Sequence, residues 1–268
     1  MNFYDRYLDL DGDNAQRIKD KFIKENLKDN KIYKFIGLSC DDTLKNLKMN
    51  AFMESKLWLT HYVNFEDVSE FKVPLNRLKV SKKTKRSIEN INNLFDTLRE
   101  IYDICCFTTD ITEYMWENYA SNHNGLCLCF EIKDTDSFFP VEYIYKKTFD
   151  LTQSAIKSIK SSDEGHTDVF GRYNKEVAIL PLVYKNFSYS KEKEIRFLYS
   201  PFDDENGFFG GIISPNIKTE KKYYGCYLAY KEMEIDLIGI IIGKSCDITI
   251  RSQVKDHCLK NEIWIKEE

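Results

Sequence analysis

The chain has 268 residues, a formal net charge of −4 and 43% hydrophobic residues. A chain of this length and apolar content buries enough surface to fold without disulfides or metals, and disorder is not expected. The acidic balance argues against extended nucleic-acid binding, which requires a basic surface.

The eight cysteines are expected to be reduced thiols. The first residues, Met1–Arg6, lack a basic segment followed by an apolar one, and no run approaches the ~18 apolar residues that span a bilayer. We therefore expect a cytoplasmic protein without a membrane segment, in which disulfides are rare. The cysteine spacings do not match the Cys-x₂₋₄-Cys pairs of structural zinc sites, so no metal is expected.

The N-terminal part of the chain is predicted to alternate between helices and strands. Apolar residues recur at helical spacing in residues 12–29, which predicts an amphipathic helix. A short strand over residues 32–36 follows, and then a helix over residues 40–53 that Ser39 is expected to cap. Residues 56–62 alternate as a second strand.

The middle of the chain contains the clearest apolar stripe, which predicts a helix over residues 82–102. A strand over residues 104–108 and a short helix over residues 112–121 follow. The helix is expected to stop near Gly125, where a buried strand begins and continues to residue 132. Residues 141–145 form another predicted strand.

The last part of the chain adds three predicted helices, a long loop over residues 203–216, two predicted strands and a closing apolar segment over residues 263–265. The helices are predicted over residues 148–162, 166–187, with a break at Pro181, and 251–260, and the strands over residues 194–199 and 235–242. Strands and helices do not alternate strictly, which favours an α+β fold over a doubly wound parallel sheet.

The first candidate site lies around the end of the predicted helix 112–121. Trp116 and Tyr119 are three residues apart, so they share a helix face, and both carry a hydrogen-bonding group that could orient a ligand. His123 follows the helix end, where cations are favoured. The alternative is that Trp116 and Tyr119 pack the helix onto the sheet.

The second candidate site is a run of charges on the predicted strand 194–199. Glu192, Glu194 and Arg196 alternate, so on a strand they share one face. Two carboxylates ~7 Å apart beside an arginine can polarise a ligand or stabilise a cationic transition state. The alternative is an exposed strand face with surface salt bridges.

The third candidate site combines two early strands. Lys34 is at the centre of the first strand, and the pair Thr60 and His61 is near the end of the second, so they could face one cleft. The alternative for Lys34 is a solvated strand face.

These segments resemble a bacterial family called domain of unknown function 2971. The family's central signature, Met-Trp-x-x-Tyr-Ala-x-x-His-x-Gly, is found from Met115 to Gly125, and its Lys-Glu-x-Glu-x-Arg box from Lys191 to Arg196. Its acidic turn differs here, with Glu66 for Asn and Val68 for Pro. The resemblance implies one α+β domain over residues 30–268, preceded by an N-terminal amphipathic helix in residues 1–29.

A more distant similarity is to ADP-ribosyltransferases of the Arg-Ser-Glu type. Those enzymes carry a basic residue on an early strand, a Ser or Thr on a second strand, and a Glu-x-Glu pair on a late strand; here the order is Lys34, Thr60, then Glu192 and Glu194. The similarity implies a mixed or split antiparallel sheet flanked by helices, with NAD cleaved in its cleft. Lys34 replaces the usual arginine and so lacks bidentate phosphate geometry.

The same similarity assigns roles to the candidate residues. Glu194, with Glu192 beside it, would be catalytic, Lys34 would hold a phosphate, and Thr60 would shape the cleft. The other ligand-binding candidates are Trp116, Tyr119, His123 and Arg196, and the three residues of the helical signature are expected beside the sheet edge that bears Glu194.

Three functions are therefore open. The first is an NAD-using, ADP-ribosyltransferase-like enzyme or effector in antiviral or stress defence, which would bind a small nucleotide ligand. The second is a non-enzymatic ligand-sensing or protein-interaction module. The third is a nuclease or other hydrolase with a divalent metal on Glu192, Glu194 and Asp67, although no Asp-x-Asp or His-x-His grouping supports it.

Overall fold

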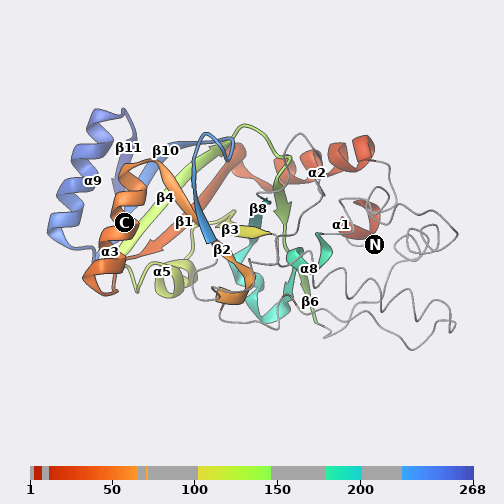
Figure 1. Ribbon diagram of the computed structural model, residues 1–268, viewed down its shortest axis with the longest axis horizontal. Coiled ribbons are helices and arrows are strands. Elements are labelled where there is room, and N and C mark those ends of the chain that lie inside the picture. Colours follow the sequence, from red (N-terminus) through yellow and green to blue (C-terminus); the bar gives the residue numbers. More distant parts are fainter. Residues whose placement is uncertain (1–2, 8–11, 66–70, 72–101, 146–178, 201–224) are drawn as a thin grey trace, which may run out of the picture.

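The computed structural model describes residues 3–7, 12–65, 71, 102–145, 179–200 and 225–268 of the chain (Figure 1). Its centre is a nine-stranded sheet in which neighbouring strands follow the order β11-β10-β4-β1-β3-β2-β9, and β8 pairs with β3 and β5. The strands are β1 (Lys31–Gly37), β2 (Lys56–His61), β3 (Asp103–Thr108), β4 (Gly125–Ile132), β5 (Phe138–Pro140), β8 (Glu194–Tyr199), β9 (Gly225–Ala229), β10 (Ile235–Ile242) and β11 (Trp264–Glu267).

Helices flank this sheet, and a small parallel pair of strands lies beside it. The pair is β6 (Glu142–Ile144) with β7 (Tyr184–Asn186). The helices are α1 (Phe3–Tyr7), α2 (Gly12–Asn26), α3 (Asp42–Met53), α5 (Glu113–Tyr119), α8 (Leu180–Val183) and α9 (Ile248–Lys260), with the 3-10 helices η1 (Lys28–Asn30), η2 (Tyr62–Asn64) and η3 (Phe187–Glu192). No helix among the described residues has the length and apolar character to cross a membrane.

The large sheet is mixed and mostly antiparallel, because only β10 and β11 pair in parallel among its described strands. The predicted α+β class, with an antiparallel or mixed sheet flanked by helices, is therefore confirmed. Most of the predicted strands are also present, and the strand over residues 235–242 is found with those bounds as β10.

The sheet is split along one edge of β3. The other edge of β3 pairs with β8 over the whole length of β3. On the split edge, β1 pairs only at Tyr33 with Thr108, and β2 pairs at the opposite end through Thr60 with Ile104. Residues 105–107 therefore have no partner on this edge among the described strands, and β1 and β2 diverge around an opening.

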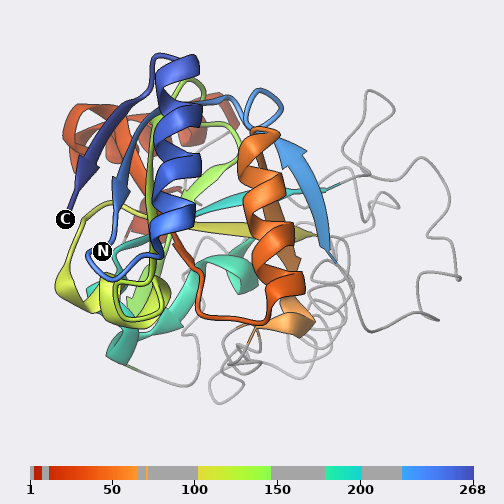
Figure 2. The same cartoon turned by 90° about the vertical axis from the view of Figure 1, so that its left-hand side faces the viewer.

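The two faces of the sheet are covered differently. Figure 2 shows α3 and α9 side by side over one face. Their apolar residues, such as Phe52 and Val254, are buried in the main core with residues of the sheet and of α2. On the other face, Trp116 of α5 packs edge-on against Phe35 of β1, with ring centroids 4.9 Å apart. Strand β4 lies between these layers, which explains its nearly continuous burial.

The N-terminal helix α2 packs directly on the edge of the sheet at β5. The ammonium of Lys19, which is fully buried, donates to the carbonyl oxygen of Asp136 and lies 4.0 Å from the centroid of the Phe139 ring. From α1, the hydroxyl of Tyr4 donates to the carbonyl oxygen of Pro140 at 2.6 Å. Both N-terminal helices thus support the strand that pairs with β8.

Two predicted details are wrong. Helix α3 begins at Asp42 and is capped by Asp41, whose carboxylate accepts from the backbone N–H of Leu44 at 3.0 Å; Ser39 does not cap it. The hydroxyl of Ser39 instead accepts from the side-chain amide of Asn124 at 2.8 Å. A carboxylate one residue before the first turn is the better cap, because its charge also favours the helix N-terminus.

The predicted helix over residues 166–187 is also wrong at its described end. Helix α8 stops at Val183, and Tyr184–Asn186 forms β7, which pairs with β6. Tertiary pairing has overridden a local helical pattern here. The predicted helices over residues 82–102 and 148–162, and the predicted loop over 203–216, lie outside the described residues, apart from Tyr102.

Candidate functional site

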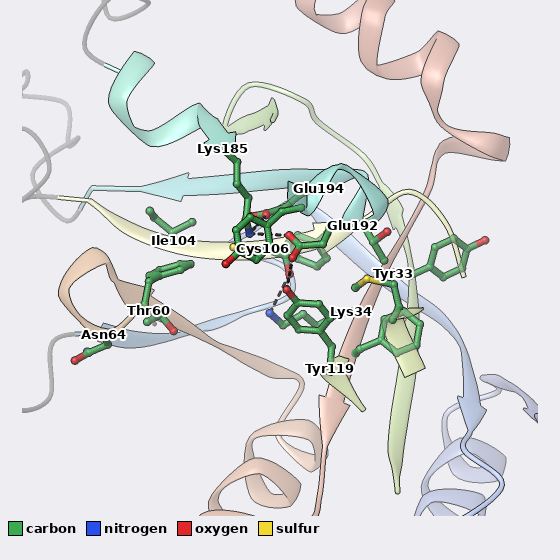
Figure 3. A pocket seen from close by; sticks show the side chains of 16 residues that line it. Tyr33, Lys34, Thr60, Asn64, Ile104, Cys106, Tyr119, Lys185, Glu192 and Glu194 are labelled. Atoms are coloured by element: carbon green, nitrogen blue, oxygen red, sulfur yellow. Dashed lines mark hydrogen bonds and ion pairs between the residues drawn. The ribbon is translucent and has the colours of Figure 1, made fainter. Parts of the chain in front are cut away.

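A cavity of about 350 Å³ lies at the opening between β1, β2 and β3 (Figure 3). Its lining includes Lys34 from β1, Thr60 from β2 and Glu194 from β8. Tyr119 and Glu192 also line it. The volume is near the lower end of the ~300–1,000 Å³ range of ligand pockets. Residues that are far apart in the sequence therefore meet where the sheet splits.

A cluster of charged side chains forms one wall of the cavity. The Nζ atom of Lys185 lies 2.6 Å from Oε2 of Glu192 and 2.9 Å from Oε2 of Glu194. Nε of Arg196 lies 2.7 Å from Oε1 of Glu194. All four residues are buried, and Arg196 is completely so. Charges removed from water persist only when they are paired and hydrogen-bonded, and this cluster meets that condition.

The two carboxylates do not share a strand, which corrects the predicted arrangement. Glu194 is the first residue of β8, but Glu192 is the last residue of η3. Between them Lys193 has a left-handed backbone with φ 45°, so the period-two alternation fails. Lys193 points outward and forms an ion pair with Asp110 at 2.9 Å. Both carboxylates reach the cavity wall even so, because they converge on Lys185.

Two tyrosines connect this cluster to other elements. The hydroxyl of Tyr119, on α5, donates to Oε1 of Glu192. The backbone N–H of Glu194 donates to the hydroxyl oxygen of Tyr143, on β6, at 2.8 Å. Tyr119 is 41% exposed, so it lies between the buried cluster and solvent. The helical signature and the Glu-rich box are thus joined by a direct hydrogen bond.

The cluster moves the pKa values of its two carboxyl groups in opposite directions. Burial raises the pKa of Glu192 above its usual 4.5, although Lys185 and Tyr119 oppose the increase. Burial alone would also raise the pKa of Glu194, but Arg196 and Lys185 outweigh it and hold that pKa well below 4.5. Glu194 is therefore a fixed anion, and Glu192 is the group better able to exchange a proton.

Lys34 brings a further positive charge to the opening in the sheet. Its Nζ atom donates to the carbonyl oxygen of Cys106 at 2.9 Å. Burial disfavours its charged form, but nearby groups, including Cys105, Cys106 and Glu194, outweigh burial and raise its pKa, so it stays cationic. Among the described residues no carboxylate lies within ion-pair distance of Lys34. Its charge is thus available to an anionic ligand.

Trp116 and His123 are not part of the cavity lining, contrary to the expected grouping with Tyr119. Trp116 is buried against Phe35 and stacks on His123, with ring centroids 5.9 Å apart. The packing alternative is therefore the arrangement observed for Trp116. Arg196 also lies behind the wall, where it holds Glu194 and does not line the cavity.

His123 belongs to a separate polar group near the last residue of the chain. Its Nδ1 atom lies 2.7 Å from Oε2 of Glu268 and its Nε2 atom 3.1 Å from Oε1 of Glu113. The three residues could offer ligand atoms to a metal ion. The two ring nitrogens face different carboxylates, however, and Nζ of Lys244 lies 3.7 Å and 3.8 Å from the two glutamates. Lys244 already supplies a positive charge here.

Two residues that hold the glutamates of the cavity wall, Lys185 and Tyr143, were not predicted from the sequence. Lys185 fell in the predicted helix 166–187, and no motif distinguishes it from other lysines. Tyr143 fell in a predicted strand that was assigned no function. The Val-x-Tyr pattern at Val141–Tyr143 was the available signal, because alternation places both side chains on one strand face.

The comparisons with known proteins find a family model that matches the central segment. A family model described as "Protein of unknown function (DUF2971)" matches residues 115–197. No curated protein and no solved structure matches the chain. The matched segment runs from α5 to β8, so it includes Tyr119, Glu192 and Glu194. The resemblance to domain of unknown function 2971 is thereby confirmed through the segment that forms the charged wall of the cavity.

Proposed function

We propose that the cavity is the active site of an NAD-using transferase of the ADP-ribosyltransferase type. One observation carries this proposal: a cationic lysine, a threonine and a pair of glutamates, contributed by β1, β2 and the segment η3–β8, line one cavity where the sheet splits. Perturbed carboxyl groups in a cavity are candidates for catalysis.

The reaction breaks the bond between the nicotinamide nitrogen and C1′ of the ribose. Both bonding electrons leave with nicotinamide, which becomes neutral, and positive charge develops on the ribose. A nucleophilic oxygen or nitrogen of the acceptor then bonds to C1′ and loses its proton. Fixed negative charge in a dry cavity stabilises the cationic centre, and a nearby base takes the proton.

On the basis of these contacts, we assign the tasks to different side chains. Glu194 is the fixed anion that faces the cationic ribose. Glu192, with its raised pKa, takes the proton of the acceptor. Lys34 binds a phosphate oxygen as a point charge. The hydroxyl of Thr60 lies on the opposite side of the opening, where it would contact the ligand.

A ligand-sensing module is the second candidate, and one observation favours it. Each oxygen of Glu194 already accepts from a cation, Arg196 or Lys185, which reduces the field that the carboxylate exerts in the cavity. In such a module the cavity would bind a nucleotide without cleaving it. The same pairing disfavours a metal-dependent hydrolase, since a divalent ion would compete with both cations for the carboxylates.

The test compares wild type with Glu192→Gln in NAD binding, by calorimetry, and in nicotinamide release, by chromatography. We expect the variant to bind NAD and to lose nicotinamide release by roughly 10²–10³-fold. The matched control is Glu131→Gln, at a partly exposed position on β4 that pairs with Lys133, which should behave as wild type. Binding without release would favour the sensor. Neither binding nor release, with any acceptor tried, would contradict the transferase.

A further inference from the structure

One ammonium group joins the two glutamates of the cavity wall. Nζ of Lys185 is 2.6 Å from Glu192 and 2.9 Å from Glu194, so both carboxylates are within hydrogen-bond reach of a single atom. The three residues come from three successive elements, β7, η3 and β8. Figure 3 shows the Lys185 side chain extending toward both carboxylates. The lysine therefore determines how closely the pair is held.

Two buried carboxylates at this separation repel each other strongly. The side chains of Glu192 and Glu194 are each only 4% exposed, so water screens them little. In that situation one carboxyl group takes up a proton unless a cation lies between them. Arg196 does not substitute for Lys185, because its Nε contacts Glu194 and its Nη1 donates to the carbonyl oxygen of Leu182 at 2.5 Å.

Other titratable groups also face the cluster and contribute to its charge balance. The hydroxyl of Tyr119 donates to Glu192, and Cys106 interacts electrostatically with Glu194. The Tyr143 hydroxyl accepts from the backbone N–H of Glu194. Tyr114 interacts electrostatically with Glu192 and Lys185. Lys34 interacts in the same way with Glu194. The ring centroid of Tyr189 lies 5.0 Å from Nζ of Lys185.

We infer that Lys185 is a positioning residue that holds Glu192 and Glu194 together in the cavity wall and keeps Glu192 ionised, so that it can accept a proton. The consequence for activity rests on the proposed function. The consequence for the carboxyl groups does not, because it follows from the contacts alone. Removal of the ammonium, with most of the side chain retained, should leave a pair that binds about one more proton near neutral pH.

The test uses Lys185→Met, whose carboxyl titration is followed by ¹³C NMR of labelled glutamate. We expect the highest apparent glutamate pKa to be about 1 unit or more higher in Lys185→Met than in wild type. Lys185→Arg, which keeps the charge, should restore most of the wild-type titration. Unchanged glutamate titrations in Lys185→Met would overturn the inference, whatever the protein does with NAD.

The chain offers a matched control on its surface. Nζ of Lys133 also joins two carboxylates, at 2.8 Å to Glu131 and 3.1 Å to Asp236, but there all three side chains are at least 39% exposed. Solvent screens that cluster, so Lys133→Met should leave the highest glutamate titration as it is in wild type. An equal change in both variants would mean that burial between two carboxylates gives Lys185 no special role, which would overturn the inference.

A double variant covers the case in which Lys185→Met does not fold. Replacing Glu192 as well removes one of the two repelling charges, so Lys185→Met/Glu192→Gln should recover stability in urea. Failure of the double variant to recover would contradict the inferred repulsion.

If nicotinamide release is measurable, Lys185→Met should lower kcat and move the acidic limb of its pH profile to higher pH with little change in KM. If wild type releases none, the proposed function falls, and the titrations still decide the role of Lys185.

Discussion

The Nζ atom of Lys34, on β1, lies 2.9 Å from the carbonyl oxygen of Cys106, on β3, across the opening in the sheet. The carbonyl has no partner strand on that edge among the described residues, and the lysine supplies its hydrogen bond. The separation of β1 and β2 thus puts a positive charge where the cavity begins.

We predict that Lys34→Met weakens the binding of phosphate-containing ligands. Loss of one charge-assisted hydrogen bond corresponds to about 1.5–3 kcal/mol, or roughly 10–100-fold in affinity. Calorimetry with NAD, and with the phosphate-free nicotinamide riboside, should show the loss for NAD alone. The control is Lys56→Met, which removes a half-exposed lysine of β2 that pairs with Glu54. Equal losses for both ligands would mean that Lys34 does not contact phosphate.

We predict that Tyr119→Phe makes Glu192 harder to ionise. The hydroxyl of Tyr119 donates to Glu192, which lowers the pKa of that carboxyl group, so removal of the hydroxyl should raise it further. The acidic limb of any pH–activity profile should then move to higher pH, and the free energy of unfolding should fall by about 1 kcal/mol. Tyr227→Phe, at an exposed position on β9, is the control. A glutamate NMR titration identical to that of wild type would contradict this prediction.

The elements that the sequence predicted well are those whose apolar pattern is complete within the element. Strand β10 is apolar apart from Asp236, and α2 has a regular stripe, so each could be recognised without its neighbours. Strands β5 and β7 are three residues long and depend on pairing with distant partners. No local period marks a strand of that length, and β7 follows a helical pattern.

The residues of the candidate site also differ in whether they could be identified from the sequence alone. Lys34, Thr60 and Glu194, on β1, β2 and β8, could be selected because their order is the one that the similarity to ADP-ribosyltransferases implies. The position of Glu192 could not be derived, since it depends on the left-handed backbone of Lys193. Lys185 could not be found at all, because its role depends on two carboxylates that only the folded chain brings together.

We predict that Gly239→Ala destabilises the protein through a contact with the C-terminal strand. A Cβ atom at Gly239 would lie 1.8 Å from the Trp264 ring, and the two residues are register partners in β10 and β11. Overpacking of this kind costs about 1–3 kcal/mol, measured as the free energy of unfolding in urea. In a background with Trp264→Ala the same change should cost much less. An equal cost in both backgrounds would rule out this contact as the cause.

We predict that the purified protein contains free thiols and no stoichiometric metal. All eight cysteines are unpaired thiols in the structure. Burial raises the pKa of Cys129 to about 11 and that of Cys226 to about 12, so neither is a thiolate at neutral pH, the form that metals and oxidants require. Thiol titration in denaturant should count all eight groups, and elemental analysis should find far less than one metal per chain. One zinc per chain would contradict the prediction.

We predict that Glu194→Gln removes an acid-dependent part of the stability. The folded-state pKa of Glu194 lies below its usual 4.5, so its ion pairs stabilise the protein above that pH and are lost as the pH falls toward the folded-state value. Glu192, whose pKa is raised, contributes in the opposite sense. Wild-type stability should therefore decrease below about pH 4.5, and the variant should lack much of this decrease.

The same substitution leaves Arg196 completely buried without its carboxylate, which typically costs about 3–5 kcal/mol near neutral pH. Urea denaturation of wild type, Glu194→Gln and the surface control Glu131→Gln, from pH 3 to pH 7, measures both effects. The stability difference between wild type and Glu194→Gln should be largest near pH 7 and should shrink as the solution becomes acidic, because the Glu194 carboxyl of the unfolded wild type then takes up a proton that the folded state resists. A difference that stays constant over this range would show that the ion pair with Arg196 does not set the pH dependence of the stability.

If the folded variant Glu194→Gln still released nicotinamide at the wild-type rate, the catalytic role assigned to Glu194 would be wrong, although the enzyme class could stand.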